Sequence, residues 1–180
     1  MANKYQHKYR ISSARLKEWN YGAEGSYFIT ICTKRREHFF GEIINNEMQL
    51  SYLGKVVEDE WLKTFELRPD MKLEMGEFIV MPNHFHGIII IGENEYNTGR
   101  DAMHGVSTFG PQSKNLGSIL RGFKSAVTTN ARKRGNTDFN WQPRFHDHII
   151  RDEASFERIQ YYIANNPANW KNDKFYGHEE

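Results

Sequence analysis

The sequence predicts a single α+β domain, an antiparallel sheet with helices packed on one face. Its 180 residues suffice for one domain with its own core. Apolar residues change between strand-like and helix-like spacing in the order β-α-β-β-α-β-α. The first six of these elements match a split βαβ arrangement, which is a ferredoxin-like sandwich. The seventh, a C-terminal helix, is additional, and it or a partner subunit is expected to cover the second face of the sheet.

The domain is expected to span residues 21–172, between a basic N-terminal arm at 1–20 and a polar tail at 173–180. Its first strand is predicted over Ser26–Arg36, where β-branched and aromatic residues dominate. A helix should follow, because apolar residues recur at helical spacing and stop near a proline, Pro69. This stripe consists of Leu50, Leu53, Val57, Trp61 and Phe65.

Two strands are predicted over residues 71–93. They should break around Met81-Pro82-Asn83, because a proline cannot donate a hydrogen bond to a neighbouring strand. Residues 93–113 contain Gly and Pro without a clear period, which predicts a long loop whose role stays open.

The second helix is predicted over residues 116–132, and a short strand over 144–152. The core face of that helix should carry Leu116, Leu120, Phe123 and Val127. Asp152 is a candidate N-cap for the last helix, which should end at Pro167.

The segment MPNHFHGIII, residues 81–90, places two histidines at the start of a strand that otherwise reads as buried. Because side chains alternate along a strand, His84 and His86 share one face. Two imidazoles at this spacing can reach one metal ion or one phosphate together. The alternative is that one or both are ordinary polar residues at a strand end.

The last helix aligns a tyrosine with a carboxamide. At about 100° per residue, Tyr162 and Asn166 lie one turn apart on a flank of the apolar face. Tyr161 points nearly the opposite way. Tyr162 and Asn166 could therefore both reach the sheet, or they could simply close the rim of the core and the end of the helix.

Cations are segregated along a chain whose net charge is only +1. Residues 114–134 carry six cations and no acid, and the helical stripe there includes Arg121, Lys124 and Arg132. The N-terminal arm is acid-free as far as Lys17, and a weaker cluster comprises Lys34, Arg35 and Arg36. Such segregation favours a polyanionic partner, although each cluster alone could be solvated surface charge.

Several classes of protein are disfavoured. No stretch approaches the roughly 20 apolar residues of a membrane helix, so no membrane partner is expected. The N-terminus lacks the apolar segment of a signal peptide. Cys32 is the only cysteine, which leaves no disulfide framework and no cysteine-based zinc site. We expect a cytoplasmic protein, associated with the nucleoid if the source is bacterial.

Four segments carry a family resemblance when taken in order: MPNHFHGII, LRGFKSAVT, WQPRFHDHIIRD and YYIANNPANW. From roughly Gly25 to Trp170 the chain resembles the single-tyrosine HUH transposases, with the closest likeness to the REP-associated tyrosine transposases and their insertion-sequence relatives. The resemblance implies that His84 and His86 ligate a divalent metal ion and that Asn166 completes the metal site. It implies that Tyr162 is the nucleophile.

The implied chemistry suits these residue types. A phenol with a pKa of about 10 is a weak nucleophile at neutral pH, and a metal ion that polarises a phosphate oxygen offsets this. Two imidazoles and a carboxamide oxygen suit Mg²⁺ or Mn²⁺ better than a closed zinc site. The resemblance implies that the products are a 5′-phosphotyrosine link and a free 3′-hydroxyl.

We therefore expect a metal-dependent endonuclease and strand transferase that acts on single-stranded DNA containing hairpins. Two alternatives stay open: a catalytically silent regulator that binds DNA hairpins, and a water-using metal-dependent nuclease. His146 and His148 form a second His-x-His pair, which we interpret as structural or supporting, with a rival metal site as the alternative. A homodimer is possible, and the sequence does not decide it.

Overall fold

The computed structural model describes residues 4–5, 8–9, 19–98 and 113–176. Its main sheet has four strands in the order β6-β7-β3-β8, and all neighbours are antiparallel. The strands are β3 (Gly25–Cys32), β6 (Leu73–Met81), β7 (His84–Ile91) and β8 (His146–Ile150). This order confirms the predicted ferredoxin-like α+β sandwich.

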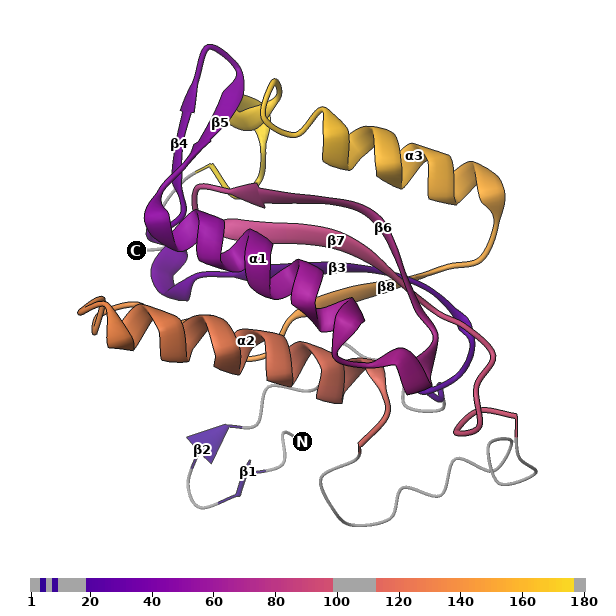
Figure 1. Cartoon of the computed structure of the whole chain (residues 1–180). Helices are drawn as coiled ribbons and strands as arrows, with labels where there is room; N and C mark the ends of the chain where they lie inside the picture. Colours follow the sequence, from indigo (N-terminus) through magenta and orange to yellow (C-terminus); the bar gives the residue numbers. More distant parts are fainter. Residues whose placement is uncertain (1–3, 6–7, 10–18, 99–112, 177–180) are drawn as a thin grey trace.

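Helices cover both faces of the sheet (Figure 1). The first two, α1 (Tyr52–Glu66) and α2 (Leu116–Lys133), pack side by side on one face. The last, α3 (Glu153–Ala164), packs on the other face, mainly against β6. The second face is thus covered by the chain's own C-terminal helix.

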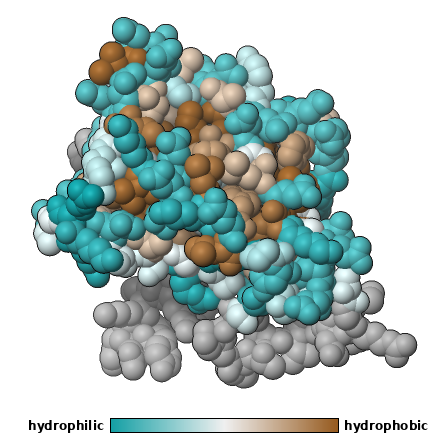
Figure 2. Space-filling view, in the orientation of Figure 1, coloured by the Kyte–Doolittle hydropathy of each residue, from teal (hydrophilic) through white to brown (hydrophobic). Residues whose placement is uncertain are grey.

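The larger core lies between the sheet and the pair α1 and α2. Alternation along β3 and β7 sends Ile29, Ile31, Phe85 and Ile89 into it, where they are fully buried. The predicted core face of α2 is confirmed, since Leu116, Leu120, Phe123 and Val127 are all buried there. In the view of Figure 2, hydrophobic residues show between the helices of this face, and polar residues surround them.

A smaller core joins α3 to the opposite face. Ile88 of β7, Ile150 of β8 and Ile163 of α3 are buried together there. They lie on the same face as His84 and His86, because all side chains at even positions of β7 share one side of the sheet. The histidines therefore lie under the helix that carries the tyrosines.

One prediction was wrong at the start of α1. The helical stripe was expected to include Leu50, but this residue belongs to an unpredicted hairpin of β4 (Gly41–Ile44) and β5 (Glu47–Leu50). Asn45 and Asn46 form its turn with φ of 52° and 64°, which are the left-handed values that a tight hairpin requires. Ser51 then caps α1, accepting a hydrogen bond from the Gly54 backbone N–H.

The first main strand is also shorter than predicted. It ends at Cys32, and residues Lys34–Arg36 form the short 3-10 helix η1. Arg35 and Arg36 have φ of 55° and 52°, which no strand accommodates. Two further 3-10 helices are η2 (Pro69–Met71) and η4 (Trp170–Asn172).

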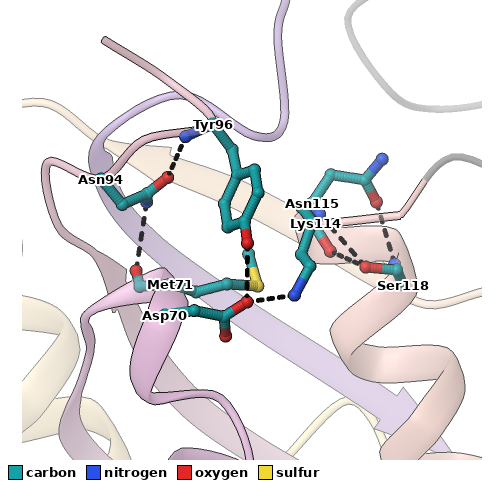
Figure 3. Close-up of polar contacts among 7 residues, drawn as sticks. All are labelled: Asp70, Met71, Asn94, Tyr96, Lys114, Asn115 and Ser118. Atoms are coloured by element: carbon teal, nitrogen blue, oxygen red, sulfur yellow. Dashed lines mark hydrogen bonds and ion pairs between the residues drawn. The ribbon is translucent and has the colours of Figure 1, made fainter.

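The long loop predicted over residues 93–113 is described only at its two ends, because 99–112 lie outside the described residues. Those ends are tied together (Figure 3). Asp70 accepts a hydrogen bond of 3.0 Å from the Tyr96 hydroxyl and pairs with the Lys114 ammonium group. Residues before and after the loop are thus fixed to η2.

The predicted N-terminal arm falls mostly outside the described residues. Two short strands are described in it, β1 (Lys4–Tyr5) and β2 (Lys8–Tyr9), which pair with each other. In the described part of the chain, no helix combines the length and the apolar character needed to cross a membrane.

Candidate active site

The histidine pair lies at the start of β7, directly after the Pro82-Asn83 turn. His84 and His86 are 0% and 1% exposed, and their ring centroids lie 4.5 Å apart. Each ring is held through Nδ1. The Nδ1 of His84 donates to Asn83 Oδ1 at 2.9 Å, and the Nδ1 of His86 is hydrogen-bonded to Thr30 Oγ1 at 2.8 Å. Of the two Nε2 atoms, that of His84 has no hydrogen-bond partner among the described residues, and that of His86 faces α3.

Both histidines are neutral at pH 7. Burial lowers the pKa of His84 well below its usual value of 6.5, and repulsion between the two imidazoles when both are protonated adds to this effect. Burial also lowers the pKa of His86 to about 3, although Asp173 opposes the shift. A neutral imidazole is the form that binds a metal ion.

Helix α3 brings Tyr162 to this pair. The Tyr162 hydroxyl lies 3.2 Å from His86 Nε2, and the two rings meet at an interplanar angle of 62°. Burial raises the pKa of the Tyr162 hydroxyl to about 12, and the negative charge of Asp173 adds to the rise. The neighbouring Tyr161 is 72% exposed.

A carboxylate that sequence reasoning missed completes the cluster. Asp173 Oδ2 accepts hydrogen bonds from the Tyr162 hydroxyl at 3.2 Å and from Asn166 Nδ2 at 3.0 Å. One ligand atom from each of His84, His86 and Asp173 lies within 4.8 Å of the other two. Asp173 belongs to the segment predicted as a polar tail, where no periodic pattern marks it.

Residues 173–176 pack against the site. Phe175 is buried, and its ring centroid lies 4.6 Å from that of His84. Its backbone carbonyl accepts a hydrogen bond of 2.8 Å from Asn83 Nδ2. Asn83 therefore links the turn that positions His84 to the segment that carries Asp173.

The site fits a divalent cation. His84 Nε2 and Asn166 Oδ1 are buried, yet neither has a hydrogen-bond partner in the part of the chain that the structure describes. Burying an unpaired polar atom is unfavourable by roughly 1–3 kcal/mol, and a bound cation would relieve this cost for each atom that it contacts. Two imidazole nitrogens with carboxamide and carboxylate oxygens suit Mg²⁺ or Mn²⁺.

A groove of about 550 Å³ opens this cluster to solvent along the C-terminal half of α3. Phe28, Thr30 and His86 line it from the sheet, and Tyr161 and Tyr162 line it from the helix. A polymer could therefore reach the Tyr162 hydroxyl without passing through the core.

The predicted cations fall into two separate places. Lys34 and Arg35 are exposed on η1, near the site, and Arg36 donates to the Lys174 carbonyl at 2.9 Å. Arg121 and Arg132 are exposed on α2, on the opposite face of the sheet from the histidines.

Lys124 differs from the other cations of α2. Its ammonium group donates to the carbonyls of Gln142 and Arg144, each at 2.8 Å. Burial lowers the pKa of Lys124 to about 8. The structure thus places Lys124 as an anchor for residues 142–144.

The second His-x-His pair lies on the same face as the site but apart from it. In β8, His146 pairs with Thr30 and His148 with Phe28, so strand β3 separates both from His86. Both are exposed. Among the described residues, neither belongs to a cluster of three side chains that could hold a metal ion.

Comparisons with known proteins find both a related sequence and similar solved structures. No family model matches the chain. An uncharacterised protein of Haemophilus influenzae is 44% identical over 167 residues, which cover 91% of this chain and 92% of that protein. The structure of a REP-associated tyrosine transposase bound to a REP hairpin superposes with a TM-score of 0.58 at 21% identity, covering 88% of this chain and 74% of that one. The crystal structure of a putative transposase from Deinococcus radiodurans has a TM-score of 0.45 at 14% identity, covering 87% and 96% respectively.

Proposed function

Because the chain belongs to one family with the Haemophilus influenzae protein and has the fold of the REP-associated tyrosine transposase, we propose that it is a transposase. In this proposal it is a metal-dependent endonuclease and strand transferase that acts on single-stranded DNA containing a hairpin. The observation that carries the proposal is the cluster around the Tyr162 hydroxyl, which lies 3.2 Å from His86 Nε2 and 3.2 Å from Asp173 Oδ2. A purely structural role for Tyr162 would not explain why it lies beside two neutral histidines, one of which has an unpaired Nε2.

The cation would be held by His84, His86 and an oxygen of Asn166 or Asp173. When bound, Mg²⁺ or Mn²⁺ would draw electron density from a phosphate oxygen and so favour attack on phosphorus. The residues around the ligands keep them in place: Asn83 fixes the His84 ring and Thr30 fixes the His86 ring.

Tyr162 would supply the nucleophile. Its oxygen forms a bond to the phosphorus of a phosphodiester, the bond from phosphorus to the 3′-oxygen breaks, and that oxygen leaves as a hydroxyl, so that the one proton lost by the phenol balances the one gained by the leaving oxygen. The phenolic proton passes to the Asp173 carboxylate, which already accepts the hydrogen bond of this hydroxyl. The raised pKa of Tyr162 makes such an acceptor necessary, since the phenol is neutral at pH 7.

The products would be a 5′-phosphotyrosine link and a free 3′-hydroxyl. The link conserves the energy of the phosphodiester, so a second 3′-hydroxyl can replace the tyrosine without ATP. Strand transfer is therefore the reverse of cleavage with a different DNA end.

The DNA would contact two groups of cations. Lys34 and Arg35, with Arg36 beside them on η1, would hold phosphates of the strand being cut. Arg121 and Arg132 of α2 would hold a more distant part, such as a hairpin stem, on the other side of the sheet. Lys124 contributes through the anchoring of residues 142–144.

Cleavage of a labelled single strand tests the proposal. With Mn²⁺ the protein should cut an oligonucleotide that carries a hairpin and its flanking sequence, and chelation by EDTA should stop the reaction. Tyr162→Phe should bind the oligonucleotide as the parent does and cut none of it, because only one hydroxyl is lost. Tyr161→Phe is the matched control and should retain cleavage. Cleavage by Tyr162→Phe at the parental rate would favour a water-using nuclease.

A further inference from the structure

The groove beside Tyr162 has features that phosphate chemistry does not use. Its volume of about 550 Å³ is in the range of sites that enclose a small organic molecule. Its inner end is the catalytic cluster, and its outer part continues along α3 to Asn169 and Asn172. Whatever fills the outer part therefore lies directly beside the phosphate that Tyr162 would attack.

Aromatic rings line the groove on two sides. Phe28 lies on the sheet, with its ring centroid 5.2 Å from that of His86 and 6.2 Å from that of Tyr162. Tyr161 lies on the helix side and is 72% exposed, so its ring is open to a ligand in the groove. Flat, exposed rings beside a single-stranded substrate are the surfaces on which unpaired bases stack.

The carboxamides along the groove present acceptor atoms. Asn165 Nδ2 donates to the Tyr161 carbonyl at 2.8 Å, and Asn169 Nδ2 donates to the Asn165 carbonyl at 2.9 Å. These bonds orient both side chains. Their Oδ1 atoms accept no hydrogen bond from any residue that the structure describes. Two oriented acceptors therefore border the groove.

We propose that this groove binds one unpaired nucleobase next to the scissile phosphate and prefers a base with an exocyclic amino group. Tyr161 supplies the stacking surface, and Asn165 and Asn169 accept hydrogen bonds from the amino group. Adenine and cytosine offer two such hydrogens, whereas thymine and uracil present a carbonyl oxygen at the same place. This inference rests on the proposed function, since it assumes that single-stranded DNA is the substrate.

Binding of two short oligonucleotides tests the inference without cleavage. Cytosine and uracil have the same size and differ mainly in an amino group against a carbonyl, so we choose fluorescein-labelled dC8 and dU8. Titrated with the Tyr162→Phe protein in Mn²⁺, dC8 should bind about three- to tenfold more tightly, as expected for one or two hydrogen bonds. Asn165→Ala and Asn169→Ala should bring this ratio toward one. Asn136→Ala, which alters an exposed asparagine beyond α2, should leave the ratio unchanged.

Stacking is tested separately in the same assay. Tyr161→Ala should weaken dC8 and dU8 alike by about fivefold or more, while Tyr161→Phe should bind both like the parent. Equal affinity of the parent for dC8 and dU8 would overturn the base preference. If Asn165→Ala and Asn169→Ala both keep the parental preference for dC8 over dU8, the carboxamides do not recognise the base.

The two proposals fail in different ways. If the protein forms no cleavage product with any single strand but retains the preference for dC8, the nuclease function fails and the base site stands. If the protein cleaves DNA and binds dC8 and dU8 equally, only the proposed base site is refuted.

Discussion

Removing Asn83 should weaken metal binding although Asn83 is not itself a ligand. Its side chain is fully buried and makes three hydrogen bonds, to His84 Nδ1 at 2.9 Å, to the Arg36 carbonyl at 3.1 Å and to the Phe175 carbonyl at 2.8 Å. At about 1 kcal/mol for each, Asn83→Ala should lower the free energy of unfolding by about 3 kcal/mol. Metal affinity should fall by about 10- to 100-fold, the usual effect of losing the partner that orients a ligating histidine.

Asn94→Ala is the matched control for this prediction. Asn94 is also buried and makes three side-chain hydrogen bonds, to the Met71 and Gly92 carbonyls and to the Tyr96 backbone N–H, but it lies at the foot of the long loop (Figure 3). Calorimetry with Mn²⁺ on both variants, below their melting temperatures, separates the two effects. Both should lose similar stability, and only Asn83→Ala should lose metal affinity. If the Mn²⁺ affinities of the two variants agree within about twofold, Asn83 does not orient a ligand.

Four further predictions follow from the same geometry. Because both site histidines are neutral, Mn²⁺ affinity should change little between pH 7.5 and 5.5, whereas two histidines with a pKa of about 6.5 would lose about 100-fold. The pKa of His86 is lowered to about 3 by folding, so the unfolded chain takes up its proton first. Stability should therefore fall by about 1.4 kcal/mol per pH unit as the pH drops from about 6.5 toward 3, and His86→Gln should flatten an acid unfolding series. Asp173→Asn should slow cleavage about 100-fold, measured in single turnovers, while DNA binding persists. Lys124→Met should lower the melting temperature and leave the salt dependence of DNA binding unchanged, whereas Arg121→Glu should flatten it.

The arrangement of the sheet and helices was predictable because it follows from local spacing. The stripe of α2 has a helical period, and the run Ile88–Ile91 is short, β-branched and bounded by glycines, which favours a buried strand. The spacing of Tyr162 and Asn166 placed both on one helix flank in the same way. The hairpin before α1 was missed because its turn depends on two asparagines in left-handed conformations, which outweigh the helical period of Leu50.

The part of the site that escaped prediction depends on contacts between distant segments. Asp173 lies near His86 because Trp170 and Phe175 pack against His84. No periodic pattern in the sequence predicts these contacts. The cations of α2 illustrate a second limit. A helical stripe shows which residues align, but the crossover of the chain decides on which face of the sheet the helix lies.

The measurement that tests the central proposal most directly is covalent capture of DNA on Tyr162. The protein is incubated with Mn²⁺ and a single strand that contains a hairpin and its cleavage site, then denatured and separated by electrophoresis. We predict an adduct that survives denaturation, and mass spectrometry of its digest should place the nucleotide on the peptide spanning Tyr162. Tyr162→Phe should give none, and Tyr161→Phe should give the adduct. A cleaved strand with no adduct, or an adduct on any other residue, would contradict the proposal.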